Sequence, residues 1–235
     1  MLLQAPDNTM PRRALCHTNG QAFHVLNRSA KRSRLFFTDS DYLLFEVTLV
    51  QALDRFPVRL LAYCVMPNHW HLVLWPVKDE LPRFMHWLTL THAQRWHRTH
   101  HSEGTGHVYQ SRYKAIPIQQ DRHLLTVLRY VERNPLRAGL VSHAESWRWG
   151  SFWRRGENRT DLPLAEWPFP QPHDWHHAVN GTEAPSDVEL IRSATQHNRP
   201  LGDETWIAAT ASRLGVPRQP GRPRKNPVWV SDLTN

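Results

Sequence analysis

The stretch of residues 63–76, Tyr-Cys-Val-Met-Pro-Asn-His-Trp-His-Leu-Val-Leu-Trp-Pro, constrains the fold of this chain most. Apolar residues flank a Met-Pro-Asn turn, which predicts two paired strands. His69 and His71 are two residues apart on the second strand, so both face one side of the sheet while Trp70 faces the other. A His-x-His pair is often incidental, but two imidazoles on a rigid strand form half of a metal site.

The chain before and through this hairpin predicts a strand, a helix and two more strands. Residues 22–28 alternate as a short strand does. Asp39 or Ser40 can cap a helix that ends near residue 55. The apolar residues that repeat at helical spacing in it are Leu43, Leu44, Val47 and Val50. Residues 58–65 then predict a buried strand that pairs with residues 69–75.

The chain after the hairpin predicts two more helices around an extended segment. Residues 81–100 have an amphipathic pattern, and residues 107–119 alternate as one bent strand or a strand pair does. Asp121 caps a helix that ends at Asn134-Pro135, because a residue before proline avoids the helical region. The core stripe of this helix is Leu124, Leu125, Leu128 and Val131. This order of elements predicts an α+β fold, with helices packed on a central, mostly antiparallel sheet.

Changes in composition divide the chain into five segments. The expected segments are an N-terminal tail at 1–15, a folded domain at 16–152, an irregular extension or linker at 153–187, a short helical segment at 188–216 and a basic disordered tail at 217–235. The extension is rich in Pro, Trp, His and Gly with weak periodicity, and the last segment has no means of burying a core.

The charge of the chain favours a polyanionic partner. Lys and Arg total 29 against 21 Asp and Glu, a formal net charge of +8, and a basic soluble protein with no such partner is the alternative. Two cysteines cannot form a disulfide framework, which indicates a reducing cytoplasm. No apolar run approaches the roughly 20 residues of a membrane span. We therefore expect a cytoplasmic protein with no membrane partner.

Tyr130 and Asn134 are the candidates for the other half of the site. They are four residues apart at the end of the helix that begins after Asp121, so they share a face. Tyrosine, with a pKa near 10, is a weak nucleophile unaided. Near a divalent cation that neutralises a phosphodiester, its oxygen can attack phosphorus and hold DNA covalently. The alternative is a helix tyrosine half packed on the core.

Several long motifs together carry a family resemblance. They are Phe23-His24-Val25 with Asn27-Arg28, Leu35-Phe36, residues 63–72, Gly106-His107-Val108-Tyr109-Gln110-Ser111-Arg112-Tyr113, residues 129–141 and Trp149-Gly150-Ser151-Phe152. With these motifs the chain resembles the REP-associated tyrosine transposases, which are domesticated bacterial relatives of the single-tyrosine HUH transposases. Those enzymes move insertion sequences as single-stranded DNA.

The resemblance implies a fold, a site and a substrate. The fold would be an HUH or ferredoxin-like, RRM-like sandwich, followed by the irregular and short-helical C-terminal extension. His69 and His71 would be ligands of Mg²⁺ or Mn²⁺, and Asn134 stands where related enzymes carry a glutamine ligand. Tyr130 would be the nucleophile of a single-strand endonuclease and strand transferase that forms a 5′-phosphotyrosine on REP-type hairpin DNA.

Basic residues supply candidate DNA contacts. They are Arg12, Arg13, Arg28, Arg32, Arg112, Arg222 and Arg224. The last two lie in Gly-Arg-Pro-Arg-Lys at 221–225, which resembles an AT-hook that reads the minor groove, although a solvated tail explains it equally. The resemblance leaves open a monomer or a homodimer, and it places the protein on the bacterial nucleoid.

Three alternatives remain open. A non-catalytic hairpin-binding protein would keep the basic surface without needing Tyr130 or the histidine pair. Tyr109 and Tyr113 are alternative nucleophiles in an extended segment, and His97 with His101 is a second histidine pair at a helix end. A structural zinc protein is disfavoured because neither cysteine has a partner at finger spacing.

Overall fold

Alternating side chains on four strands build a sheet with two different faces. In the computed structural model, which describes residues 17–216, the strands are β1 (Ala22–Arg28), β2 (Val58–Met66), β3 (His69–Pro76) and β4 (Lys114–Ile118). They lie in the order β2-β3-β1-β4, and each neighbouring pair is antiparallel. The predicted α+β fold with a mostly antiparallel sheet is confirmed.

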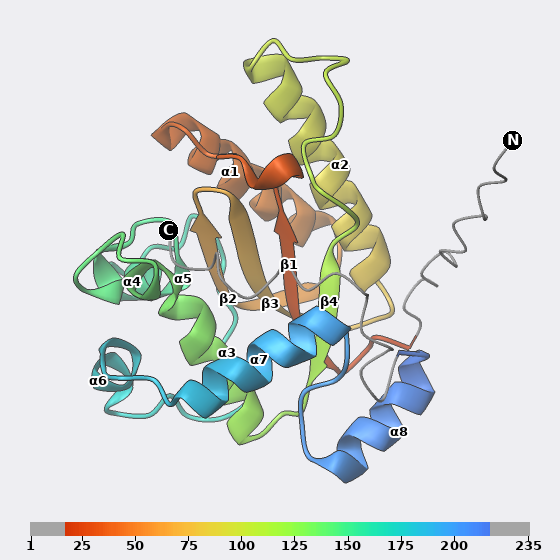
Figure 1. Ribbon diagram of the computed structural model, residues 1–235, viewed down its shortest axis with the longest axis vertical. Helices are drawn as coiled ribbons and strands as arrows, with labels where there is room; N and C mark the ends of the chain where they lie inside the picture. The colour runs from red at the N-terminus through yellow and green to blue at the C-terminus, as the bar shows by residue number, and fades with distance from the viewer. Residues whose placement is uncertain (1–16, 217–235) are drawn as a thin grey trace, which may run out of the picture.

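Helices cover both faces of this sheet (Figure 1). On one face, α1 (Asp39–Arg55) and α2 (Leu81–Thr99) bury a core with Phe23, Trp70 and Leu72 from the strands. On the other face, α3 (Arg122–Glu132), α6 (Trp175–Asn180) and α7 (Pro185–His197) form a second core. Because the side-chain period of a strand is two, His69 and His71 face the second group of helices.

The central hairpin and the helix after Asp121 form as predicted. In the hairpin, Cys64 lies opposite His71 and Met66 lies opposite His69, with a register shift between Leu60 and Ala62. The Asp121 carboxylate accepts a hydrogen bond from the His123 backbone amide at 2.8 Å, which caps α3. Short helix α4 (Asn134–Arg137) follows directly after α3.

Helix α1 buries a different stripe from the one that its aliphatic residues mark. Leu43 and Val47 are 43% and 51% exposed, whereas Phe45 and Leu49 are fully buried. Two apolar stripes at helical spacing overlap in this sequence. The stripe with the aromatic rings faces the sheet because it removes more apolar surface from water.

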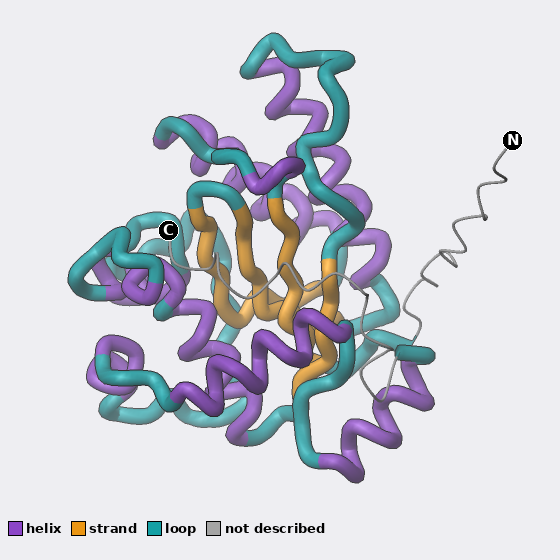
Figure 2. The backbone as a smooth tube through the Cα atoms, viewed as in Figure 1, coloured by secondary structure: helices purple, strands orange, loops and turns teal. Residues whose placement is uncertain are grey.

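The segment at 107–119 is extended over a shorter length than its alternation indicates. Strand β4 begins only at Lys114, and Tyr109 makes an isolated bridge with Ser29. Figure 2 shows the chain between α2 and β4 as loop. Both alternatives, one bent strand and a strand pair, are therefore wrong for the first half of this segment.

The chain beyond residue 150 packs on the domain. It contains α5 (Ser151–Gly156) and α8 (Glu204–Leu214) in addition to α6 and α7. The residues that it buries include Leu162, Trp175, Val179, Ile191, Ala194, Leu201 and Ile207. Short 3₁₀ turns at Ala30–Arg32 and Ala144–Ser146 complete the described elements. Across residues 17–216, no helix is long and apolar enough to span a membrane.

Candidate active site at the His-x-His strand

His69 and His71 lie side by side on β3. Their ring centroids are 4.9 Å apart and their planes are nearly perpendicular. The His69 Nδ1 lies 2.6 Å from the Asn68 side-chain oxygen, so Nδ1 carries the proton and donates it. The second ring nitrogen of His69, Nε2, then carries a lone pair. A ring nitrogen that donates to an oxygen while the other nitrogen stays free is the arrangement found in metal-bound histidines.

His24 from β1 joins this pair, which the sequence reasoning did not predict. Its Nε2 lies 2.8 Å from His71 Nδ1, and the two rings stack with centroids 5.0 Å apart. Alternation along β1 places His24 on this face, but the contact depends on the pairing of β1 with β3. The sequence therefore indicated the face of β1 on which His24 lies, but not that His71 is its neighbour.

Burial keeps these imidazoles neutral. It lowers the pKa of His24 from 6.5 to about 3, and burial together with the nearby Arg28 lowers the pKa of His69 from 6.5 to about 3. Burial likewise lowers the pKa of His71, and the neighbouring His69 and His24 add to the effect. A neutral imidazole has a lone pair on one ring nitrogen, which is the form that binds a metal ion.

The ring of Tyr130 lies against two of the histidines. Its centroid is 5.9 Å from that of His71 and 6.0 Å from that of His24, both with the rings edge to face. On another side of the ring, the Arg137 guanidinium lies 4.1 Å from the centroid. Of the predicted histidine pair, His71 is the member whose ring packs against Tyr130, and both residues belong to one chain.

Asn134 lies at the start of α4 and is 7% exposed. Its side-chain oxygen accepts a hydrogen bond from Arg137 Nη1 at 3.0 Å. Because arginine only donates, this contact sets which end of the amide faces the guanidinium. Within residues 17–216, the buried Asn134 Nδ2 has no hydrogen-bond partner.

A buried carboxylate fixes the end of α3 two residues beyond Tyr130. Glu132 accepts hydrogen bonds from Ser151 Oγ at 2.7 Å, Arg155 Nη1 at 2.9 Å and Trp175 Nε1 at 2.8 Å. Burial raises the pKa of Glu132, while Arg155 opposes that shift. These three contacts tie the tyrosine-bearing helix to the chain beyond residue 150.

The predicted arginines fall in different places. Arg28 lies beside the site, where burial and Arg32 lower its pKa and Tyr130 opposes the shift. Arg32 ends the 3₁₀ turn after β1, and Arg112 lines a groove together with Tyr113 and His86. The other four, Arg12, Arg13, Arg222 and Arg224, lie outside the described residues.

The alternative tyrosines and histidines lie away from this face. The Tyr109 hydroxyl accepts from Trp70 Nε1 at 3.2 Å and pairs with His92 Nδ1 at 2.7 Å, on the α2 side of the sheet. Tyr113 lines the groove with Arg112. His97 Nδ1 pairs with the Ser102 hydroxyl at 2.9 Å. The geometry therefore favours Tyr130 over the other two tyrosines as the group nearest His71.

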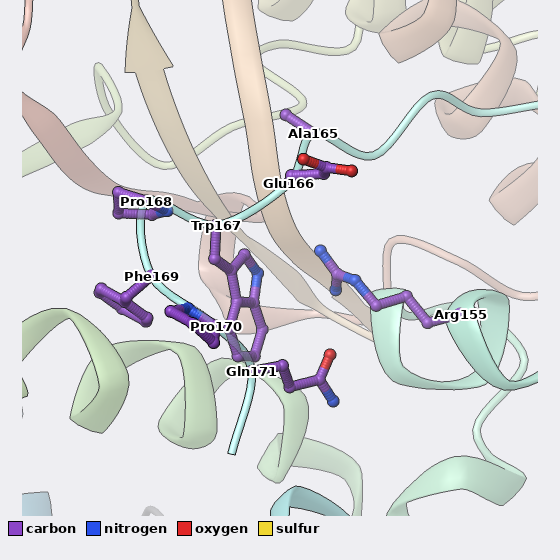
Figure 3. Close-up of a pocket in the computed structure, with 8 residues that line it drawn as sticks. All are labelled: Arg155, Ala165, Glu166, Trp167, Pro168, Phe169, Pro170 and Gln171. Atoms are coloured by element: carbon purple, nitrogen blue, oxygen red, sulfur yellow. The ribbon is translucent and has the colours of Figure 1, made fainter. Parts of the chain in front are cut away.

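A second hollow lies along the 165–171 segment, and none of the predicted site residues lines it (Figure 3). Its walls include Arg155, whose guanidinium lies 5.1 Å from the centroid of a Trp167 ring. Trp167 Nε1 donates to the Leu61 carbonyl at 3.1 Å, so this segment is fastened to the sheet at the irregularity in β2.

The two neutral imidazoles beside Tyr130 are nitrogen donors of the kind that can bind a divalent cation. Within residues 17–216, no group of three or more His, Cys, Asp or Glu side chains is placed to hold a metal ion. His69 and His71 lie side by side, and the Asn134 oxygen keeps one lone pair free after the Arg137 contact. Water and phosphate oxygens commonly complete the coordination of Mg²⁺ and Mn²⁺.

A family match covers the part of the chain that carries these histidines and Tyr130. The family described as IS200-like transposase matches residues 17–134, just over half of the 235 residues, and the chain belongs to that family. Its fold is similar to the solved structure of a REP-associated tyrosine transposase bound to a REP hairpin. The TM-score is 0.52 at 17% identity, over 70% of this chain and 93% of that chain. Among curated proteins, none matches the sequence.

Proposed function

We propose that this chain is a metal-dependent single-strand DNA endonuclease and strand transferase that acts on REP-type hairpins. The observation that carries the proposal is the edge-to-face packing of Tyr130 on His71 and His24. Membership of a transposase family supports DNA as the substrate. The fold similarity to a hairpin-bound transposase supports a hairpin as its form.

The chemistry follows from the residues of this site. His69 and His71, with the Asn134 oxygen, would hold Mg²⁺ or Mn²⁺, which when bound polarises the scissile phosphate. The Tyr130 oxygen attacks phosphorus and forms a new P–O bond, while the bond from phosphorus to the 3′ oxygen breaks. The phenolic proton ends on the released 3′ oxygen. A 5′-phosphotyrosine and a free 3′-hydroxyl result, and rejoining needs no ATP because the bond energy is retained.

The surroundings of the site support binding of a polyanion by a single chain. Arg28 lies near Tyr130, and Arg32 lies in the 3₁₀ turn that follows Arg28 at the end of β1. Tyr130 and the histidines of the site come from the same chain, so a monomer can assemble the site. We propose Arg112 as a third phosphate contact, in the groove beside Tyr113. Aromatic side chains such as Tyr113 can stack on unpaired bases.

A covalent-adduct assay tests the proposal. Labelled single-stranded hairpin DNA is incubated with Mn²⁺ and one of three proteins: the parent, the Tyr130→Phe variant or the Tyr113→Phe variant. Tyr113→Phe is the matched control, because Tyr113 lies in the groove beside Arg112. We expect the parent and Tyr113→Phe to cleave the hairpin and form the adduct, and Tyr130→Phe to bind DNA without cleaving it. If the parent binds the hairpin and never cleaves it, the chain is a non-catalytic hairpin-binding protein instead.

A further inference from the structure

Three arginines repeat every four residues along α3 and α4, so they lie on one side of these helices. They are Arg129, Arg133 and Arg137. All three bind residues 178–183, at and just beyond the end of α6, which packs beside α3 (Figure 1). Arg129 donates to the carbonyls of Ala178 at 2.6 Å and Thr182 at 2.8 Å. Arg133 Nη1 donates to a carbonyl of the same segment at 2.5 Å.

Glu183 supplies the carboxylate that pairs with two of these arginines, Arg133 and Arg137. It accepts hydrogen bonds from Arg137 Nε at 2.8 Å and from Arg137 Nη2 at 2.7 Å, a bidentate pair. It also lies 3.2 Å from Arg133 Nε. The Glu183 side chain is 10% exposed and that of Arg137 is 18% exposed, so water screens this pair only partly. A bidentate pair fixes the plane of the guanidinium as well as its position.

The Arg137 guanidinium also contacts two residues of the candidate site, Tyr130 and Asn134. It lies over the Tyr130 ring at 4.1 Å and donates to the Tyr130 carbonyl at 3.2 Å. It also donates to the Asn134 side-chain oxygen at 3.0 Å, which sets the direction of that amide. The orientation of Arg137 therefore determines how Tyr130 and Asn134 are held.

We propose that Glu183 is a positioning residue, which acts through Arg137 on the Tyr130 ring and the Asn134 amide. This inference rests on the proposed function for its catalytic consequence. It assigns a role to a residue that lies some fifty positions beyond Tyr130 and outside the 17–134 match to the family. Without its carboxylate partner, the Arg137 side chain gains rotamers in which it no longer lies over the ring.

Kinetics of cleavage test the route through Arg137. Misplacement of a reacting group by about 1 Å can cost on the order of 100-fold in rate, so we expect Glu183→Gln to lower kcat by at least about tenfold. The hairpin KM should change by less than about twofold, because Glu183 is not among the proposed phosphate contacts. Glu183→Asp keeps the charge and should recover part of the rate. Arg137→Lys loses the planar fork and should match or exceed the defect.

A double variant separates positioning from general loosening. If Glu183 acts through Arg137, Glu183→Gln combined with Arg137→Lys should be no slower than Arg137→Lys alone. The control is Glu145→Gln, because Glu145 holds α6 through Asn180 at 2.8 Å and His176 at 2.9 Å without touching Arg137. It should leave kcat within about twofold of the parent. Additive losses in the double variant, or an equal loss in the control, would overturn the proposal.

A measurement on the free protein keeps this inference apart from the proposed function. The chain has five tyrosines, and 3-fluorotyrosine labelling gives each a fluorine NMR signal, with Tyr130 assigned by its absence in Tyr130→Phe. We expect Glu183→Gln and Arg137→Lys to shift the Tyr130 signal and Glu145→Gln to leave it in place. A parent that forms no adduct refutes the proposed function alone. An unmoved Tyr130 signal in Glu183→Gln refutes the positioning role.

Discussion

Replacing His24 with leucine should weaken metal binding, although His24 is not itself a predicted ligand. His24 and His71 are 2% and 4% exposed, and their ring nitrogens are 2.8 Å apart. Leucine fills a similar volume but leaves His71 Nδ1 buried without its partner. If Nδ1 bears the proton and donates it to His24, the lone pair of His71 is on Nε2, where it can reach a cation.

The size of this effect follows from the lost hydrogen bond. Removal of a histidine's outer hydrogen-bond partner typically lowers metal affinity about 10- to 100-fold. At about 1.36 kcal/mol per tenfold change, that is about 1.4–2.7 kcal/mol. The range agrees with the penalty of about 1–3 kcal/mol for leaving one buried polar group unpaired. We therefore expect His24→Leu to bind Mn²⁺ at least about tenfold more weakly than the parent.

Isothermal titration of Mn²⁺ into the DNA-free protein measures the affinity directly. His92→Leu is the matched control, because His92 is also fully buried and paired, but with Tyr109 on the α2 side of the sheet. That variant should lose stability and keep its Mn²⁺ affinity. Equal affinities for the parent and a folded His24→Leu would refute the assignment of His24 as the residue that orients His71.

Three further outcomes follow from the fold, the buried histidines and the tail. Leu49→Ala should lower the free energy of unfolding in urea by about 2–5 kcal/mol, and Val47→Ala on the exposed side of α1 by less than about 0.5 kcal/mol. Burial lowers the pKa of His92 from 6.5 to about 3, so the unfolded chain binds its proton first as pH falls. As pH falls from 6.5 toward 3, the free energy of unfolding should therefore decrease by about 1.4 kcal/mol per pH unit because of this residue. His92→Phe should remove that part of the pH dependence, measured by urea titrations at several pH values. Truncation after Gly215 should lower hairpin affinity and flatten its dependence on salt if residues 217–225 contact phosphates; an unchanged slope in binding titrations would indicate a passive tail.

Local signals predicted the elements that depend on neighbouring residues. The hairpin at 63–76 follows from its turn tripeptide and the apolar strands on either side. The helix after Asp121 follows from its cap and its stripe of leucines, and the structure has both. Tyr130 and Asn134 lie on either side of the junction between α3 and α4, and their four-residue spacing keeps both within reach of the Arg137 guanidinium.

Contacts between segments far apart in the sequence could not be predicted from local patterns. His24 meets His71 only because β1 pairs with β3, and a period of two gives the face of each residue but not the strand beside it. In α1, two apolar stripes overlap, and the surface that packs on them decides which stripe is buried. The Arg137 contact with Glu183 spans 46 residues and leaves no periodic trace in the sequence.

Two carboxylates, Glu132 and Glu183, link the end of the tyrosine-bearing helix and the residues just after it to the chain beyond position 150. Glu132 binds Ser151, Arg155 and Trp175, while Glu183 binds the arginines that follow Tyr130. Without the chain after residue 152, Glu132 would lose Arg155 and Trp175, and an unpaired buried carboxylate costs about 3–5 kcal/mol. The match to the transposase family ends at Asn134, so it contains the histidines and the tyrosine but not these partners. The C-terminal extension is therefore part of what holds the candidate site, because the proposed chemistry requires Tyr130 to stay on the histidine face.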